Sequence, residues 1–209
     1  MSSAVVLLSG GLDSLVSLGV AVKETDVKLA LTFDYGQKAF EEEFQAASRI
    51  AKSYGIEHKC IKLDFLCELY SSKKDKDNTV FENVWVPNRN GLFINVAASF
   101  CDARGYDYII FGANAREAES FPDNSKEFIE KINASLEFST LNKAKVYAPL
   151  VDLTKVEIIN LALKEDINLA DLKSCYGAKG HCGKCTSCTL LKEAILESNN
   201  PDLSNLFFC

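Results

Sequence analysis

Short apolar segments alternate with longer segments of helical periodicity along most of this chain. The short apolar runs predict strands, because a buried strand of a parallel sheet is apolar on both faces. Such runs predict strands at residues 4–9 and 108–111. Residues 28–33 alternate polar and apolar side chains and predict a further strand, and we expect two more at residues 58–63 and 146–150. The last of these is expected at an edge of the sheet, because Pro149 cannot donate a hydrogen bond to a neighbouring strand.

The longer segments carry apolar residues every three or four positions, which predicts helices at residues 14–23, 40–54, 91–104 and 189–198. Gly55 and Gly105 are well placed to end two of them. Two more helices, reaching to about residues 138 and 164, are expected to begin at capping boxes, Asn124 with Glu127 and Thr154 with Glu157. Residues 71–83 have almost nothing to bury, so we expect a flexible loop there.

Strands that alternate with helices predict an α/β fold with an open, mostly parallel sheet and helices on both faces. Ligands of such sheets bind where the carboxyl ends of the strands turn into helices. The loops after Leu8, Phe33 and Phe111 are therefore the expected position of a site.

Charge and apolar content narrow the class of partner. The 209 residues carry 29 acidic and 23 basic side chains, a net charge of −6, which disfavours nucleic acid and favours a small-molecule substrate. No apolar run is long enough to span a membrane. The amino-terminal residues do not resemble a secretory signal, so we expect a cytoplasmic protein.

The first of these loops reads Ser9-Gly10-Gly11-Leu12-Asp13-Ser14. Two glycines allow a sharp turn that points successive N–H groups at one spot, at the positive end of the following helix, which suits a phosphate. Asp13, expected to be an exposed loop acid, fits beside a phosphate only if a cation such as Mg²⁺ lies between them. The loop therefore predicts a nucleotide and metal site, against the alternative of a plain strand-to-helix turn.

Four cysteines gather near the carboxyl end, at Cys175, Cys182, Cys185 and Cys188. Clustered cysteines in a chain without a secretory signal indicate metal binding. Four thiolates close a tetrahedral zinc site, so we expect structural Zn²⁺. An iron–sulfur cluster and free redox thiols are the alternatives.

The glycine-rich loop resembles the pyrophosphate-binding loop of the ATP pyrophosphatase (PP-loop) superfamily. Three further motifs occur with it in the order found in 7-cyano-7-deazaguanine synthases: residues 32–38, residues 86–90, and Cys175-Tyr176 with the other three cysteines. Together they make the chain similar to that family over nearly its whole length. The resemblance implies a single domain of the adenine nucleotide alpha-hydrolase type over residues 1–209, with a zinc-binding segment at residues 172–209.

The resemblance also implies a function. Such an enzyme is an ATP-dependent carbon–nitrogen ligase that converts 7-carboxy-7-deazaguanine and ammonia into 7-cyano-7-deazaguanine, a queuosine or archaeosine precursor, through adenylated intermediates. It implies ATP and Mg²⁺, and it allows a homodimer. The alternatives are a relative that activates another carboxylate or passes it to another amine, and a tRNA-thiolating enzyme of the same superfamily.

The residues that match the family's motifs fall into two sets. The expected catalytic residues are Asp13, Ser14, Arg89, Asp123 and Lys155. The expected nucleotide-binding residues are Leu7, Leu8, Ser9, Gly10, Gly11, Leu12, Asp13, Ser14, Leu15, Val16, Ser17, Phe33, Asp34, Tyr35 and Gln37.

Three of these residues also have a purely structural interpretation. Arg89 could be a surface arginine packed on Trp85, and Asp34 could form a turn before Gly36. Lys155 could be an ordinary first-turn residue, although acids suit that position better than bases.

Residues 116–125 depart from the bacterial pattern. They keep Pro122 and Asp123 but have Asn124-Ser125 where that pattern has Cys-Arg. This loop resembles an archaeal branch of the family.

Overall fold

The computed structural model describes residues 1–71, 85–177 and 179–208 and centres on a five-stranded sheet. Its strands are β1 (Ser3–Leu7), β2 (Asp26–Asp34), β3 (Glu57–Lys62), β4 (Tyr108–Ile110) and β5 (Lys145–Tyr147). Every pairing is parallel, in the order β3-β2-β1-β4-β5. The predicted open parallel sheet is confirmed, with β5 at an edge.

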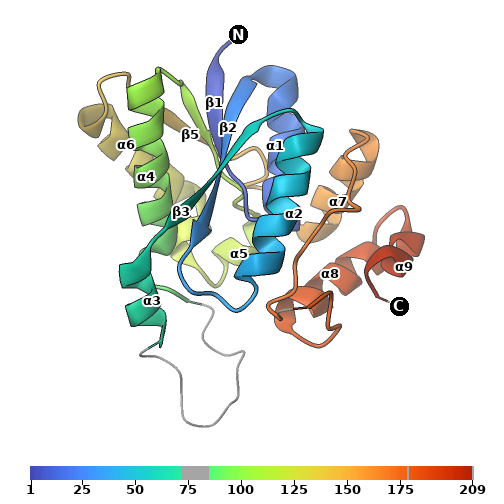
Figure 1. The fold of residues 1–209 in the computed structure, drawn as a ribbon. Helices are drawn as coiled ribbons and strands as arrows, with labels where there is room; N and C mark the ends of the chain where they lie inside the picture. Colours follow the sequence, from blue (N-terminus) through green and yellow to red (C-terminus); the bar gives the residue numbers. More distant parts are fainter. Residues whose placement is uncertain (72–84, 178, 209) are drawn as a thin grey trace.

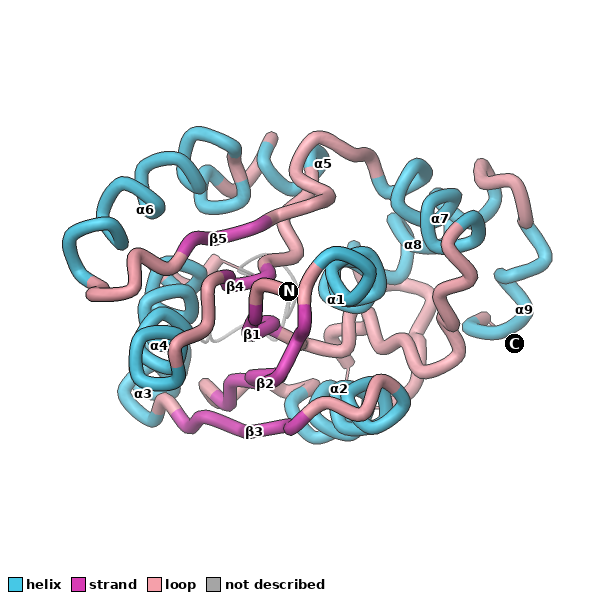
Figure 2. Tube along the Cα trace, turned by 90° about the horizontal axis from the view of Figure 1, so that it is seen from above, coloured by secondary structure: helices cyan, strands magenta, loops and turns pink. Residues whose placement is uncertain are grey.

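Helices cover both faces of this sheet (Figures 1 and 2). The longer ones are α1 (Leu12–Glu24), α2 (Phe40–Ser53), α4 (Arg89–Arg104), α6 (Lys126–Ser139), α7 (Lys155–Lys164) and α8 (Thr186–Leu196). Shorter helices are α3 (Asp64–Ser71), α5 (Ala115–Ala118) and α9 (Ser204–Phe207), with 3₁₀ turns at Pro122–Asn124 and Pro201–Leu203.

Strand β1 shows why two layers of helices form. Successive side chains of a strand point to opposite faces. Ala4 and Val6 accordingly join a core with α1, α7 and α8, whereas Val5 and Leu7 join a second core with α4 and α6. The four successive apolar residues at positions 4–7 of β1 therefore require cover on both sides of the sheet.

Several boundaries differ from the sequence predictions. Helix α6 is capped by Ser125, whose Oγ accepts from the N–H of Phe128, so the predicted cap at Asn124 is wrong by one residue. The capping box of Thr154 and Glu157 is confirmed. Helix α8 begins at Thr186, three residues before the predicted start at Thr189. Helix α3 was not predicted from the sequence. Residues 72–83 of the expected flexible loop lie outside the described residues.

Next to β1, the order in which successive strands are added to the sheet changes direction. From β1 the chain moves outward to β2 and β3, and then returns to β4 on the other side of β1. Ligands of doubly wound sheets bind at such a switch point. The loops that follow β1 and β4 are therefore the position of the candidate site.

Candidate active site at the switch point

The glycine-rich loop is held by its own serines and by α2. The N–H of Gly11 donates to Ser9 Oγ, and Ser14 Oγ donates to the Gly11 carbonyl. Gly10 has φ +80°, and a Cβ there would lie 2.9 Å from the Ala46 Cβ. A side chain at Gly10 is thus excluded both by its backbone conformation and by the packing of α2.

Gly112, the second residue after β4, closes the loop from the other side. A Cβ at Gly112 would lie 2.9 Å from the backbone of both Asp13 and Ser14. Only a glycine lets the β4 loop touch the start of α1 so closely. Sequence reasoning did not place Gly112 in the site, because nothing near it in the chain reveals a contact 98 positions away.

Asp13 lies in the first turn of α1 and is largely buried, so the expectation of an exposed loop acid is wrong. Its side chain is 16% exposed, and its Oδ2 lies 2.5 Å from Lys155 Nζ. Its other oxygen, Oδ1, is buried without a hydrogen-bond partner in the described part of the chain. Burial raises the pKa of the Asp13 carboxyl, and the Lys155 ammonium opposes that rise.

Lys155, the first residue of α7, contacts a second acid that sequence reasoning missed. Its Nζ lies 2.9 Å from Glu117 Oε1, on α5. Burial alone would lower the pKa of Lys155, but Asp13 and Glu117 outweigh it and raise that pKa. The dipole of a helix disfavours a cation in its first turn, so the two carboxylates, and not the helix, stabilise Lys155 at this position.

The second part of the site surrounds Arg89. Its guanidinium lies over the Tyr35 ring, 5.8 Å from the centroid, and its Nη1 is 3.3 Å from the Tyr35 hydroxyl. Trp85 stacks on Phe121 instead, with ring centroids 5.8 Å apart. The Arg89 guanidinium therefore packs on Tyr35, whereas the ring of Trp85 packs on Phe121.

Asp123 is near Arg89 and buried. Its backbone carbonyl lies 3.5 Å from the Asn90 amide, and burial raises the pKa of its carboxyl while Arg89 opposes the rise. The altered loop thus brings Glu117 to Lys155 and Asp123 to Arg89, so it contributes to both halves of the site.

The residues after β2 are held in place locally. Asp34 Oδ1 accepts from the N–H of Gly36, the turn contact expected of its structural interpretation. Gln37 donates to the carbonyl of Phe33 and to Glu43. Phe33 is buried against Phe93, with ring centroids 4.1 Å apart. A role of these residues in nucleotide binding stays a prediction.

Side chains of the nucleotide-binding set are not equally accessible. Leu8, Leu12, Leu15, Val16 and Ser17 are buried in the core. Only their backbone groups lie along the loop and the start of α1, so any contact of these residues with a nucleotide would be a backbone contact.

The four cysteines form a compact cluster beside α2. Their sulfur atoms all lie within 4.8 Å of one another, and Cys182–Cys188 and Cys175–Cys185 are each 4.0 Å apart. Backbone N–H groups of Lys184 and Cys185 donate to Cys182 Sγ and lower the pKa of that thiol to about 6. These donors favour the thiolate of Cys182, the form in which cysteine binds a metal.

A buried lysine joins this cluster to the glycine-rich loop. Lys173 Nζ lies 2.8 Å from Glu42 Oε2 on α2 and donates to the carbonyls of Gly177 and Gly180. Its backbone N–H donates to the carbonyl of Gly10. The cysteine segment and the loop after β1 are therefore one connected structure.

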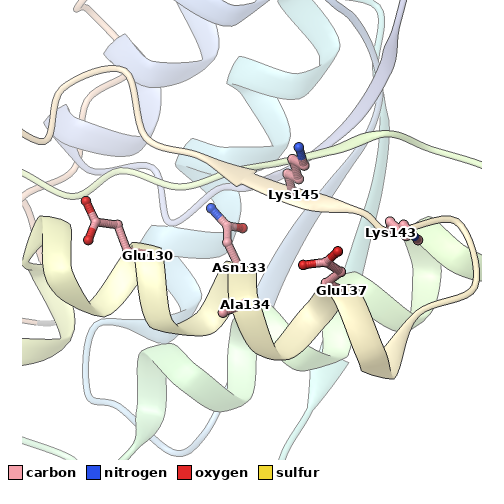
Figure 3. A pocket seen from close by; sticks show the side chains of 6 residues that line it. All are labelled: Glu130, Asn133, Ala134, Glu137, Lys143 and Lys145. Atoms are coloured by element: carbon pink, nitrogen blue, oxygen red, sulfur yellow. The ribbon is translucent and has the colours of Figure 1, made fainter.

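A cavity of about 430 Å³ lies away from these residues, between α6 and β5 (Figure 3). It is lined by Glu130, Asn133, Ala134, Glu137, Lys143 and Lys145. Asn133 bonds both backbone groups of Val146 and so covers an edge strand. Lys145 begins β5, so this groove is at the amino end of the sheet, where ligands of such folds do not bind.

The sheet order and the glycine-rich loop define a PP-loop type of α/β protein. Solved structures agree on the fold: an NMN synthetase from Francisella tularensis matches with a TM-score of 0.53 and 19% identity, over 98% of this chain and 71% of that one. The U34-tRNA thiolase NcsA from Methanococcus maripaludis matches with a TM-score of 0.51 and 17% identity, over 98% and 66%.

Sequence comparison gives the family. The model of the family described as "Queuosine biosynthesis protein QueC" matches residues 3–199. The 7-cyano-7-deazaguanine synthase of Methanosarcina mazei is 41% identical over 88% of this chain and 90% of its own. That of Carboxydothermus hydrogenoformans is 43% identical over 93% and 98%. The chain belongs to the QueC family of 7-cyano-7-deazaguanine synthases.

Proposed function

We propose that this chain converts 7-carboxy-7-deazaguanine, ammonia and ATP into 7-cyano-7-deazaguanine, for queuosine or archaeosine synthesis in the cytoplasm. The observation that carries the proposal is the meeting of Asp13, Lys155 and Gly112 at the switch point, in a chain of this family. No helix within the described residues could cross a membrane. A homodimer stays a prediction.

The loop after β1 would hold the β- and γ-phosphates of ATP. The first N–H groups of α1 have no partner within the helix and point toward its amino end, which suits an anion. Donors fixed in this way stabilise charge on a departing pyrophosphate without having to reorganise.

Asp13 fits a role in holding Mg²⁺. Its Oδ1 is buried without a partner in the described part of the chain, and carboxylate oxygens are among the preferred ligands of this ion. When bound, Mg²⁺ would offset the negative charge of the phosphates. Lys155, already on Asp13, is a second cation for the charge that develops at the α-phosphate.

The opposite half of the site suits a deazaguanine acid. Arg89 can pair with a carboxylate in two parallel hydrogen bonds. The buried carboxylate of Asp123 can accept from the N–H groups on the guanine edge. The Trp85–Phe121 stack offers an aromatic face beside them.

Zinc is the metal that the cysteine cluster fits best. Zn–S bonds of about 2.3 Å in a tetrahedron place the sulfurs about 3.8 Å apart, close to the 4.0 Å between two of the pairs. A cubic iron–sulfur cluster lies between its cysteines and holds them farther apart than one ion does. A site closed by four thiolates has no open position, so the role of the zinc is structural.

The product tests this proposal. Mass spectrometry of a reaction with 7-carboxy-7-deazaguanine, ATP, Mg²⁺ and ammonium chloride should show the nitrile and AMP. Turnover of ATP with another carboxylate only would contradict the assignment of the substrate.

A further inference from the structure

A second, much smaller cavity lies between the candidate active site and the cysteine segment. Its volume is about 30 Å³, and the residues around it include Glu117, Lys155, Ser174, Tyr176, Ser187 and Leu190. A water molecule needs about 10–15 Å³ of such space. The cavity thus has room for one or two molecules of that size but not for a whole nucleotide or deazaguanine.

Its lining is polar on one side and apolar on the other. Glu117, Lys155 and three hydroxyl-bearing residues supply the polar groups, and leucines of α1 and α8 supply the rest. Ser187 Oγ donates to the Ser174 carbonyl, which leaves the oxygen lone pairs of Ser187 as acceptors. A small molecule with several N–H or O–H donors matches this set of acceptors.

We propose that this cavity is the ammonia site of the enzyme, with Glu117 as its principal acceptor; the inference rests on the proposed function. Ammonia has the size of water and carries three N–H donors and one lone pair. Glu117 and the hydroxyl oxygens hold the N–H groups, which leaves the lone pair for the adenylated carboxyl carbon. Lys155 joins the cavity to Asp13 and hence to the ATP site.

The chemistry of the step requires such a position. The nitrogen of ammonia bonds to the adenylated carboxyl carbon, the bond to the AMP oxygen breaks, and a proton leaves the nitrogen to solvent. Water in the same place would hydrolyse the adenylate instead. A site that holds ammonia beside Lys155 raises the local concentration of ammonia there, so that ammonia competes with water for the adenylate.

The first experiment separates ammonia binding from adenylation. In Glu117→Gln, the amide oxygen can still accept from Lys155, but the negative charge is lost. We expect the KM for ammonium chloride to rise about tenfold or more, the effect of a lost hydrogen bond to a charged group. Pyrophosphate exchange into ATP, driven by the acid without ammonia, measures adenylation separately, because Glu117 also contacts Lys155. The rise in KM for ammonium should exceed any change in the KM for the acid or for ATP.

Glu119→Gln is the matched control, since Glu119 follows closely in the chain and is exposed, with Arg116 as its partner. It should behave like the unmodified protein in both assays. An unchanged KM for ammonium in Glu117→Gln, with or without a loss of exchange, would overturn the proposal. Absence of exchange and of nitrile in the unmodified protein would instead refute the proposed function itself.

The second experiment uses the size of the cavity. Leu190→Ala removes three carbons from its wall and should admit methylamine. We expect the variant to form the N-methyl amide and AMP, with a higher rate for methylamine relative to ammonia than the unmodified protein. Leu196→Ala, an exposed position on the same helix, should leave that ratio unchanged. An equal ratio in Leu190→Ala and the unmodified protein would overturn the proposal.

Discussion

Lys155 Nζ lies 2.5 Å from Asp13 Oδ2, although the two residues are 142 positions apart in the chain. The contact joins the first turn of α7 to the first turn of α1, so two helix starts face the same point. Both side chains are at most 16% exposed. An ion pair this shielded from water is sensitive to the loss of either partner.

Asp13→Asn should abolish nitrile formation, because the neutral amide lacks the negative charge with which the carboxylate binds a metal ion and pairs with Lys155. Since the pair is largely buried, the variant should also lose roughly 1–3 kcal/mol of unfolding free energy. Denaturant unfolding measures the second effect, and Lys126→Ala, in an exposed pair with Asp152, is the control. Activity near that of the unmodified protein would refute the role of Asp13.

Gly112→Ala should reduce acid-dependent pyrophosphate exchange by about 100-fold, the effect of a shift of about 1 Å in a reacting group. The added Cβ would lie 2.9 Å from the backbone of Asp13 and Ser14, so the start of α1 must move. Circular dichroism should show that the variant remains folded. A rate of pyrophosphate exchange equal to that of the unmodified protein would mean that the loop after β4 can move without disturbing the phosphate site.

The cysteine cluster should bind about one zinc per chain. Metal removal by a chelator should lower the melting temperature and also weaken ATP binding, because the Lys173 N–H holds the Gly10 carbonyl. Elemental analysis and calorimetry measure the two effects. Iron with visible absorbance in the isolated protein would contradict the assignment of zinc.

We expect His58 to make the unfolding free energy of the protein depend on pH. Its ring lies between Thr32 Oγ1 and Ser48 Oγ, and burial lowers its pKa. The folded protein therefore binds a proton there less readily than the unfolded chain, whose histidine has a pKa of about 6.5. Stability should be unaffected by His58 above that pH and should fall as the pH drops through it.

His58→Gln removes this titration. Between pH 8 and pH 5.5, the unmodified protein should lose more unfolding free energy than the variant. Equal losses in the two proteins would show that the folded structure binds the proton as readily as the unfolded chain does.

The sequence predicted the sheet and most helices because β1, β2 and β4 bury both faces, which makes continuous apolar runs. It failed where a contact distant in the chain decides the outcome. Burial of Asp13 depends on Lys155, and the need for glycine at residue 112 depends on the start of α1. The sequence contained one indirect sign of Glu117: Lys155 lies at a helix start, a position that favours acids, and so requires a nearby carboxylate.

The central claim is that the loop after β1 binds a leaving pyrophosphate, so that the substrate carboxylate attacks the α-phosphate of ATP. The most direct test uses 7-carboxy-7-deazaguanine labelled with ¹⁸O in its carboxylate. The account predicts label in the phosphate of AMP, with two AMP and two pyrophosphate formed per nitrile, because the carboxyl and then the amide oxygen leave on AMP. Label in inorganic phosphate, with ADP as the nucleotide product, would mean attack at the γ-phosphate and would contradict it.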